Sequence, residues 1–166
     1  ALLELSSGVS QSVGALSFGG TGGATSGQGT VLIGSTATLT LGGNVTYTST
    51  GNPLPAYVSG AGGLALSATR TFTINDSASV GASAPELTVA VPITGSFGIT
   101  KTGAGTLTLG GTNSYSGLTT IANGKLFLDG QHTGAGGFIV ATNTVLWGTG
   151  IADVAGVTVQ NGGQLG

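Results

Sequence analysis

Short apolar segments recur at a fixed interval in the second half of this chain, and that interval limits the folds it can adopt. The segments T-L-T-L, K-L-F-L, T-V-L-W and G-Q-L begin at Thr106, Lys125, Thr144 and Gly163, a constant offset of 19 in the numbering. A glycine closely follows each of the first three. A repeat this short cannot hold a helical hairpin. It suits one coil of a β-solenoid, in which short strands and turns complete a circuit.

Weaker copies of the same element occur upstream. The segment 38–43 (T-L-T-L-G-G) returns unchanged at 106–111, an offset of 68 that also relates Tyr47 to Tyr115. The segments 14–19 and 30–34 resemble the same element with irregular spacing. We therefore interpret these pieces as further copies of the same element with less regular spacing.

The composition favours strands over helices and a folded chain over a disordered one. Charged residues make up only 5%, so the charged side chains that favour helix surfaces are nearly absent. Thr, Val, Ile and Leu in short runs between glycines are typical of strands joined by tight turns. The 34 Gly and 4 Pro stay below the roughly 25–30% that marks low-complexity chains, and the 39% of apolar residues can form a core.

These observations predict a single all-β domain over residues 1–166, a parallel β-helix (β-solenoid) of roughly eight coils. Residues 1–94 are expected to form less regular coils with loops, and residues 95–166 regular coils. Alternation along the strands places four leucines inside the coil, namely Leu107, Leu109, Leu126 and Leu128. It places Thr106, Thr108 and Lys125 outside.

The run from Thr100 to Leu126 closely resembles the autotransporter-associated β-strand repeat, also called the passenger-associated transport repeat. The pattern of that family is K-x-G-x-G-x-L-x-L-x-G, then N-x-Y-x-G, then T-x-[IV]-x-x-G-x-L. Its landmarks are present in order and without a gap: Lys101, Gly103, Gly105, Leu107, Leu109, Gly111, Asn113, Tyr115, Gly117, Thr119, Ile121, Gly124 and Leu126. Leu118 stands where the family often has Gly. The resemblance implies a right-handed β-helix in the passenger of a large exported bacterial protein, with the repeat assisting passage or folding at the outer membrane.

Charge and hydropathy exclude several classes of partner. The net charge is −2, and Arg70, Lys101 and Lys125 are too few to neutralise the phosphates of a nucleic acid. The chain has no Cys, so it can form neither a disulfide nor a thiolate metal site. It contains no run of about 18 apolar residues, so we expect no membrane insertion by this segment. An extracellular or bacterial outer-surface location fits these features.

Residues that could perform chemistry are sparse. Asp129 and His132 form the one nearby acid–His pair, and their setting (D-G-Q-H) is typical of a solvated turn. A β-helix polysaccharide enzyme would need at least three of the five acids to converge in one groove, and paired-carboxylate chemistry stays open as a minor alternative. No G-G-x-G-x-D repeat for Ca²⁺ occurs. We predict no enzyme, and no catalytic, cofactor-binding or metal-binding residues.

A threonine face and an aromatic platform are two possible binding surfaces. Thr-x-Thr pairs could order water on a flat face, although Thr is common at outward strand positions of any sheet. Four aromatic residues could form a platform for sugars: Trp147, Tyr115, Tyr57 and Tyr47. We expect Tyr115 to pack at a corner and Trp147 to pack in the core or at a coil end.

The sequence therefore predicts a non-catalytic, structural rod that spaces or displays other modules on the cell surface. Open coil ends have unpaired strand edges, so the expected partners are adjacent repeats of a longer chain or other copies stacked end to end into a fibre. The alternative function is a carbohydrate-binding or adhesin-type surface module whose partners are surface glycans.

Overall fold

The computed structural model describes residues 1–19, 28–51, 54–81 and 84–166, and within them every ordered element is a β-strand. Eight strands form sheet A: β1 (Leu2–Leu5), β4 (Thr30–Ile33), β7 (Ala56–Gly60), β10 (Leu87–Val89), β13 (Thr106–Leu109), β16 (Lys125–Leu128), β19 (Val145–Trp147) and β22 (Gln164–Leu165). Seven strands form sheet C: β3 (Leu16–Phe18), β6 (Val45–Tyr47), β9 (Arg70–Ile74), β12 (Ile99–Thr102), β15 (Thr119–Ile121), β18 (Phe138–Val140) and β21 (Val157–Val159).

Two shorter sheets follow one another along the remaining side. Sheet B contains β2 (Ser10–Val13), β5 (Thr38–Leu41), β8 (Gly63–Leu66) and β11 (Ile93–Thr94). Sheet D contains β14 (Thr112–Asn113), β17 (Gln131–His132) and β20 (Ile151–Ala152). The backbone N–H of Ser114 donates to the carbonyl oxygen of Ile93, at 2.9 Å, and so links the end of sheet B to the start of sheet D.

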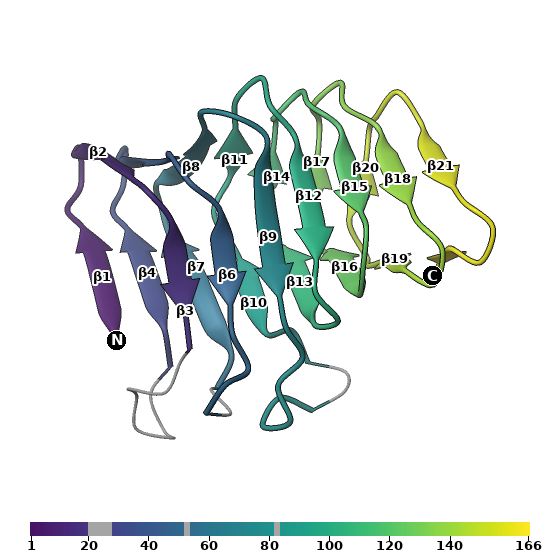
Figure 1. Cartoon of the computed structure of the whole chain (residues 1–166). Coiled ribbons are helices and arrows are strands. Elements are labelled where there is room, and N and C mark those ends of the chain that lie inside the picture. Colours follow the sequence, from purple (N-terminus) through teal and green to yellow (C-terminus); the bar gives the residue numbers. More distant parts are fainter. Residues whose placement is uncertain (20–27, 52–53, 82–83) are drawn as a thin grey trace.

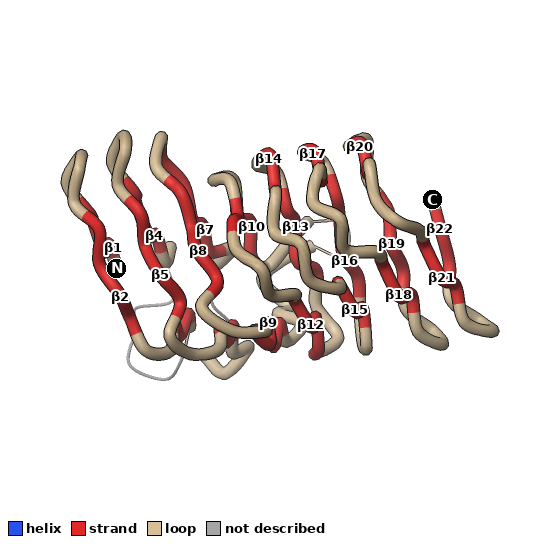
Figure 2. Tube along the Cα trace, turned by 90° about the horizontal axis from the view of Figure 1, so that it is seen from above, coloured by secondary structure: helices blue, strands red, loops and turns tan. Residues whose placement is uncertain are grey.

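The chain winds through these sheets in a fixed order, A, then B or D, then C. In Figure 1 it rises along sheet A at the rear, crosses the top and descends along sheet C in front while it advances from left to right, so the coil is right-handed. Figure 2 shows the same stack from above, with neighbouring coils side by side. Strands of adjacent coils pair in parallel in each sheet, for example β13 with β16 and β12 with β15. The prediction of an all-β parallel helix is confirmed.

Coils are larger in the first part of the chain than in the second. Thr30 pairs with Tyr57 and Tyr57 with Thr88, whereas Thr106 pairs with Lys125 after a much shorter stretch of chain. In the sequence, the extra residues stand between the strands of sheet C and the next strands of sheet A, for example between β9 and β10. The sequence favours a loop in the Gly-rich stretch 19–29 and another at Pro53 and Pro55, and residues 20–27 and Pro53 lie outside the described residues.

The constant interval expected from the sequence is wrong at one coil. Lys125 pairs with Val145, not with Thr144, and Val145 pairs with Gln164, so the strands begin one position later than the sequence predicted. The additional residue is absorbed at the corner 141–144, where Asn143 adopts a positive φ of 59°. The Thr144 hydroxyl donates to the carbonyl oxygen of Ala141 at 2.8 Å and reaches that of Ile121 at 3.2 Å. This turn makes the coil one residue longer than its two neighbours.

The two copies of the repeated hexapeptide do not occupy equivalent positions in the coil. The first T-L-T-L forms β5 in sheet B, and the second forms β13 in sheet A. Likewise, the segment 14–19 supplies β3 of sheet C, whereas 30–34 supplies β4 of sheet A. Alternating apolar residues suit any strand with one buried face, so the pattern does not specify which side of the coil the strand occupies.

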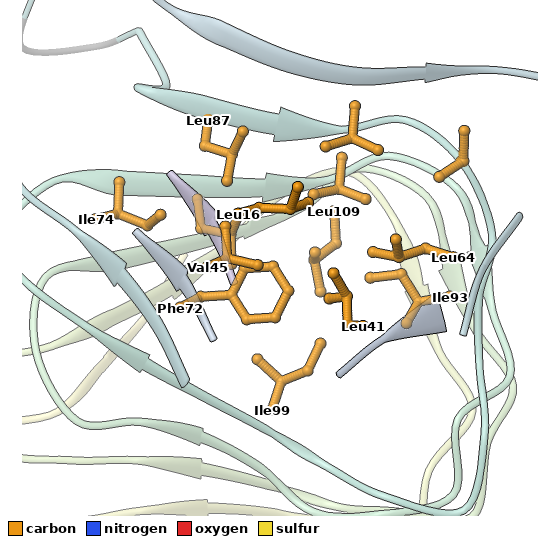
Figure 3. Packing of buried hydrophobic residues seen from close by; sticks show 14 of the residues in the cluster. Leu16, Leu41, Val45, Leu64, Phe72, Ile74, Leu87, Ile93, Ile99 and Leu109 are labelled. Carbon is orange, nitrogen blue, oxygen red and sulfur yellow. The ribbon is translucent and has the colours of Figure 1, made fainter. Parts of the chain in front are cut away.

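A continuous apolar core fills the coil. Side chains from sheets A, B and C interdigitate there, as Figure 3 shows for Phe72, Ile99 and their neighbours. The four leucines expected inside (Leu107, Leu109, Leu126 and Leu128) are all buried in this core, which confirms that prediction. Thr106 and Thr108 alternate with these leucines on the outer side, yet neighbouring side chains cover them too.

Candidate functional site

The one acid–His pair of the sequence does not form a dyad. Asp129 is exposed at a corner, where its Oδ1 accepts a long hydrogen bond of 3.4 Å from the N–H of Thr149. His132 points the other way, into the core, and is fully buried. The two side chains therefore lie on opposite sides of the coil wall.

His132 occupies an apolar niche between two aromatic rings. Its ring centroid lies 4.4 Å from that of Tyr115 and 5.3 Å from that of Phe138. Neither ring nitrogen makes a hydrogen bond of good geometry with the described residues. Burial lowers the pKa of His132, and a weak interaction with the backbone of Gly136 opposes that shift only in part. This imidazole is a neutral core residue.

Two of the five acids meet at the corner between sheets C and A. The Glu86 carboxylate is buried and accepts hydrogen bonds from the N–H groups of Thr106 at 2.6 Å and Ser77 at 3.3 Å. Burial raises the pKa of Glu86, and a hydrogen bond with the exposed Asp76 raises it further. Within the described residues, no group of three or more His, Cys, Asp or Glu side chains is placed to hold a metal ion.

Lys101, the first landmark of the repeat, is buried inside the coil in the column of Phe72 and Ile121. Its ammonium donates to the carbonyl oxygens of Thr102 (2.9 Å), Gly103 (2.7 Å) and Asn123 (3.0 Å). Burial lowers the pKa of Lys101 to about 8, an effect that the charge of Glu86 partly opposes. The sequence analysis did not foresee this placement, since lysines are rarely fully buried.

Other polar landmarks of the repeat also serve the backbone. Asn113 donates to the carbonyl oxygens of Gly111 (2.9 Å) and Gln131 (3.3 Å) and accepts from the N–H of Ile93 (3.1 Å). It thereby joins three successive coils. The buried Tyr115 hydroxyl lies 2.6 Å from that of Thr119, and burial raises the pKa of Tyr115 to about 12.

Glycine landmarks permit close stacking at the corners. Gly103 has a positive φ of 77°, and a side chain there would collide with the backbone oxygen of Ile74. The glycines and the polar landmarks together stabilise the corners of the coil. The polar groups of the repeat therefore form hydrogen bonds within the fold.

The four aromatic candidates do not form one platform. Tyr47 and Tyr115 are buried in the core, which agrees with the corner position expected for Tyr115, and Tyr57 is half-buried. Of the two positions expected for Trp147, the core is wrong, because its side chain is 54% exposed on the outer face of sheet A. The coil end agrees with the structure, because β19 pairs with β22, the outermost strand of sheet A. A register shift of one residue exchanges inward and outward positions, and the longer coil before β19 causes that shift here.

The Thr-x-Thr pairs are spread over three sheets. Thr38 and Thr40 lie in sheet B, Thr106 and Thr108 in sheet A, and Thr71 and Thr73 in sheet C. Sheet C alone stacks such pairs in adjacent coils, where the hydroxyls of Thr73 and Thr102 are 3.0 Å apart.

Both ends of the coil expose positions that are core elsewhere. At the C-terminal end, Leu165 is 59% exposed although it continues the buried column of Leu126 and Leu146. Val157 and Val159, which continue the columns of Phe138 and Val140 in sheet C, are each 40% exposed. A hollow of about 210 Å³ opens at this end, lined by Leu128, Leu146, Trp147, Gly148, Gly150, Ala152, Val157, Leu165 and Gly166.

The N-terminal coil also exposes a side chain at a position that is core elsewhere. Leu3, which stacks on the buried Val31, is 41% exposed. The outer strand edges at the two ends belong to β1, β2 and β3 and to β20, β21 and β22. No helix among the described residues has the length and hydropathy needed to span a membrane.

Comparison with known proteins agrees with this picture. Residues 99–128 match the family described as Passenger-associated-transport-repeat. The chain is also similar to the adhesin BmaC autotransporter of Brucella suis biovar 1 (strain 1330), with 38% identity over 79 residues. That alignment covers 47% of this chain but only 2% of the adhesin. No solved structure matches. The ordered landmarks, their positions in the coil and the family match agree: this chain is a β-helix whose residues 99–128 match the passenger-associated transport repeat.

Proposed function

We propose that this chain is a non-catalytic structural segment of an exported passenger, stacked between further coils of a longer β-helix outside the bacterial cell. The observation that carries the proposal is the exposure of core positions at both ends, with Leu3 at one end and Leu165 at the other. Covering such side chains is favourable by about 25 cal/mol for each Å² of apolar surface removed from water.

The geometry of the two ends suits one more coil on each side. The outer strands of sheets A and C have free edges that face along the coil axis, and parallel pairing is already the rule within the stack. A strand added to such an edge would bury the exposed side chain in its column and pair the free backbone groups together.

Coils of the same passenger are the occupants that we favour over a second copy. The related adhesin is far longer than the aligned region, which amounts to 2% of its length. Passenger repeats of this family belong to exported proteins, which supports a location on the outer surface. The isolated segment, lacking those neighbours, should stack end to end as a substitute.

The polar residues support a structural function over catalysis. Lys101, Glu86 and His132 are buried, and the first two are bonded to the backbone, so none is presented to a substrate. The proposed segment should associate through its open coil ends. An independent surface module would not need to associate, so end-to-end association distinguishes the two functions.

The test is sedimentation velocity and electron microscopy of the chain over a dilution series. We expect rods whose length grows with concentration, since each junction buries apolar surface. Val159→Lys, which places a charge in the exposed column of sheet C, should give monomers, because the junction would bury an unpaired charge. Thr158→Lys, on the outer side of the same strand, is the matched control and should still assemble. A wild-type chain that stays monomeric, or equal assembly of both variants, would overturn the proposal.

A further inference from the structure

Two aromatic rings lie together on the outer face of sheet A. Phe127 and Trp147 are paired in register on β16 and β19, with ring centroids 5.3 Å apart and an interplanar angle of 63°. Phe127 is half-buried, whereas Trp147 is the most exposed aromatic residue that the described structure contains. An edge contact of this kind holds the indole in a fixed orientation.

The next position of the same outward column is a glycine. The N–H of Gly166 donates to the carbonyl oxygen of Leu146 at 3.2 Å and thereby continues the ladder beside Trp147. A side chain at 166 would begin 3.6 Å from the indole Cγ and 3.8 Å from both Cδ1 and Cδ2. Such nearly equal distances place that point over the ring. Because residue 166 is glycine, it places no side chain over the indole and offers a shelf of backbone there.

Polar groups border this shelf. The outer face of β16 presents Lys125 before Phe127, and Asp129 follows the strand. Gln164 is exposed on β22 next to Val145. An ammonium, a carboxylate and an amide thus lie on the same outer face as the exposed indole, on or next to its neighbouring strands, and their formal charges cancel.

We propose that this surface binds a neutral carbohydrate, with a pyranose ring stacked on Trp147 over Gly166. The apolar C–H face of a sugar suits a bare indole, while the flanking donors and acceptors suit its hydroxyls. One cation and one anion give no preference for a charged polymer. This inference goes beyond the proposed structural function, since the site lies on the outer wall of the coil, whereas further coils would stack on its ends.

The experiment uses the fluorescence of Trp147, the one tryptophan of the chain. The chain, at a concentration where sedimentation shows monomers, is titrated with neutral tetrasaccharides of glucose, mannose, galactose and N-acetylglucosamine, and with a heparin tetrasaccharide. We expect at least one neutral sugar to shift the emission saturably and the heparin fragment to have no effect. The absence of any response to the neutral sugars, or a preference for heparin, would overturn the proposal.

Variants locate the site independently of fluorescence, by calorimetric titration with the best sugar. Trp147→Ala and Gly166→Val should each weaken binding at least tenfold, the second because its side chain occupies the shelf without removing the indole. Phe97→Ala removes an exposed aromatic residue outside this patch and should leave the affinity within twofold. Circular dichroism checks that each variant keeps the β-helix. Unchanged affinity in both site variants would place any sugar elsewhere and refute the assignment.

Discussion

The ammonium nitrogen of Lys101 lies 3.0 Å from the backbone carbonyl oxygen of Asn123, one coil further along the chain. The same ammonium is bonded to two carbonyl groups of its own corner. A single side chain therefore connects the corners of two coils from inside the core. This arrangement explains why the pattern of the repeat begins with lysine even though its surroundings are apolar.

Replacement of Lys101 by Met should destabilise the chain. The variant keeps the bulk of the side chain but leaves three carbonyl oxygens without their donor, so we expect a loss of roughly 2–3 kcal/mol in the free energy of unfolding. Urea unfolding followed by circular dichroism measures it. Lys125→Met, at a half-buried outer position, is the matched control and should cost less than about 1 kcal/mol. Equal losses in the two variants would contradict the interpretation.

The buried ammonium should also make stability depend on alkaline pH. The folded pKa of Lys101 is about 8, below the ordinary value of 10.5, so between these values the unfolded state binds the proton more tightly. Raising the pH from 8 to 10.5 therefore favours the folded state through this group. We expect the stability difference between wild type and Lys101→Met to grow across this window. A difference that stays constant would show that the ammonium is not desolvated.

His132 should make the chain sensitive to mild acid. Its pKa is lowered from 6.5 by burial, so protons bind the unfolded state first as the pH falls through that value. Stability should decline from pH 7 to pH 5 in urea titrations. His132→Phe keeps an aromatic ring between Tyr115 and Phe138 and should reduce this decline. An identical pH profile in the variant would assign the acid sensitivity to other groups.

The same substitution should have opposite effects at two buried threonines. The Thr108 hydroxyl has no hydrogen-bond partner in the described residues, so Thr108→Val should stabilise the chain by up to about 1 kcal/mol. The Thr119 hydroxyl is paired with that of Tyr115, so Thr119→Val should destabilise by about 1–2 kcal/mol. Chemical denaturation of both variants decides the point, and a shared sign would refute it.

Local patterns predicted the strands well because alternation with a buried face is a property of each segment alone. The burial of Leu107 and Leu109 followed directly from it. The pattern could not predict which sheet a strand joins, so identical hexapeptides are interpreted as one element although they lie on different sides. The core alternative for Trp147 fails for a reason of register. One extra residue at the corner of Asn143 shifts the register, and each shift of one residue reverses inside and outside.

For the candidate sites too, local patterns were informative, whereas features that depend on the stacking of coils were not predictable. The turn-like setting of Asp129 and His132 argues against a catalytic pair, but it does not predict the burial of His132, whose niche is completed by Tyr115 of the preceding coil and by Phe138 of its own coil. Lys101 and Glu86 form hydrogen bonds with the backbone of an adjacent coil, and these partners are brought close only when the coils stack. The sequence alone does not show that Gly166 lies beside Trp147, because this depends on the register of β22.

Because the backbone hydrogen bonds between coils run along the axis of the stack, tension applied to the two ends would load them directly. The contacts of each coil are confined to its neighbours, so coils would detach one at a time from an end. A coil such as the one from Thr106 to Lys125 occupies about 4.8 Å of the axis when folded and extends to about 65 Å when released. A surface tether built in this way would lengthen in steps under shear and absorb mechanical work without breaking the chain.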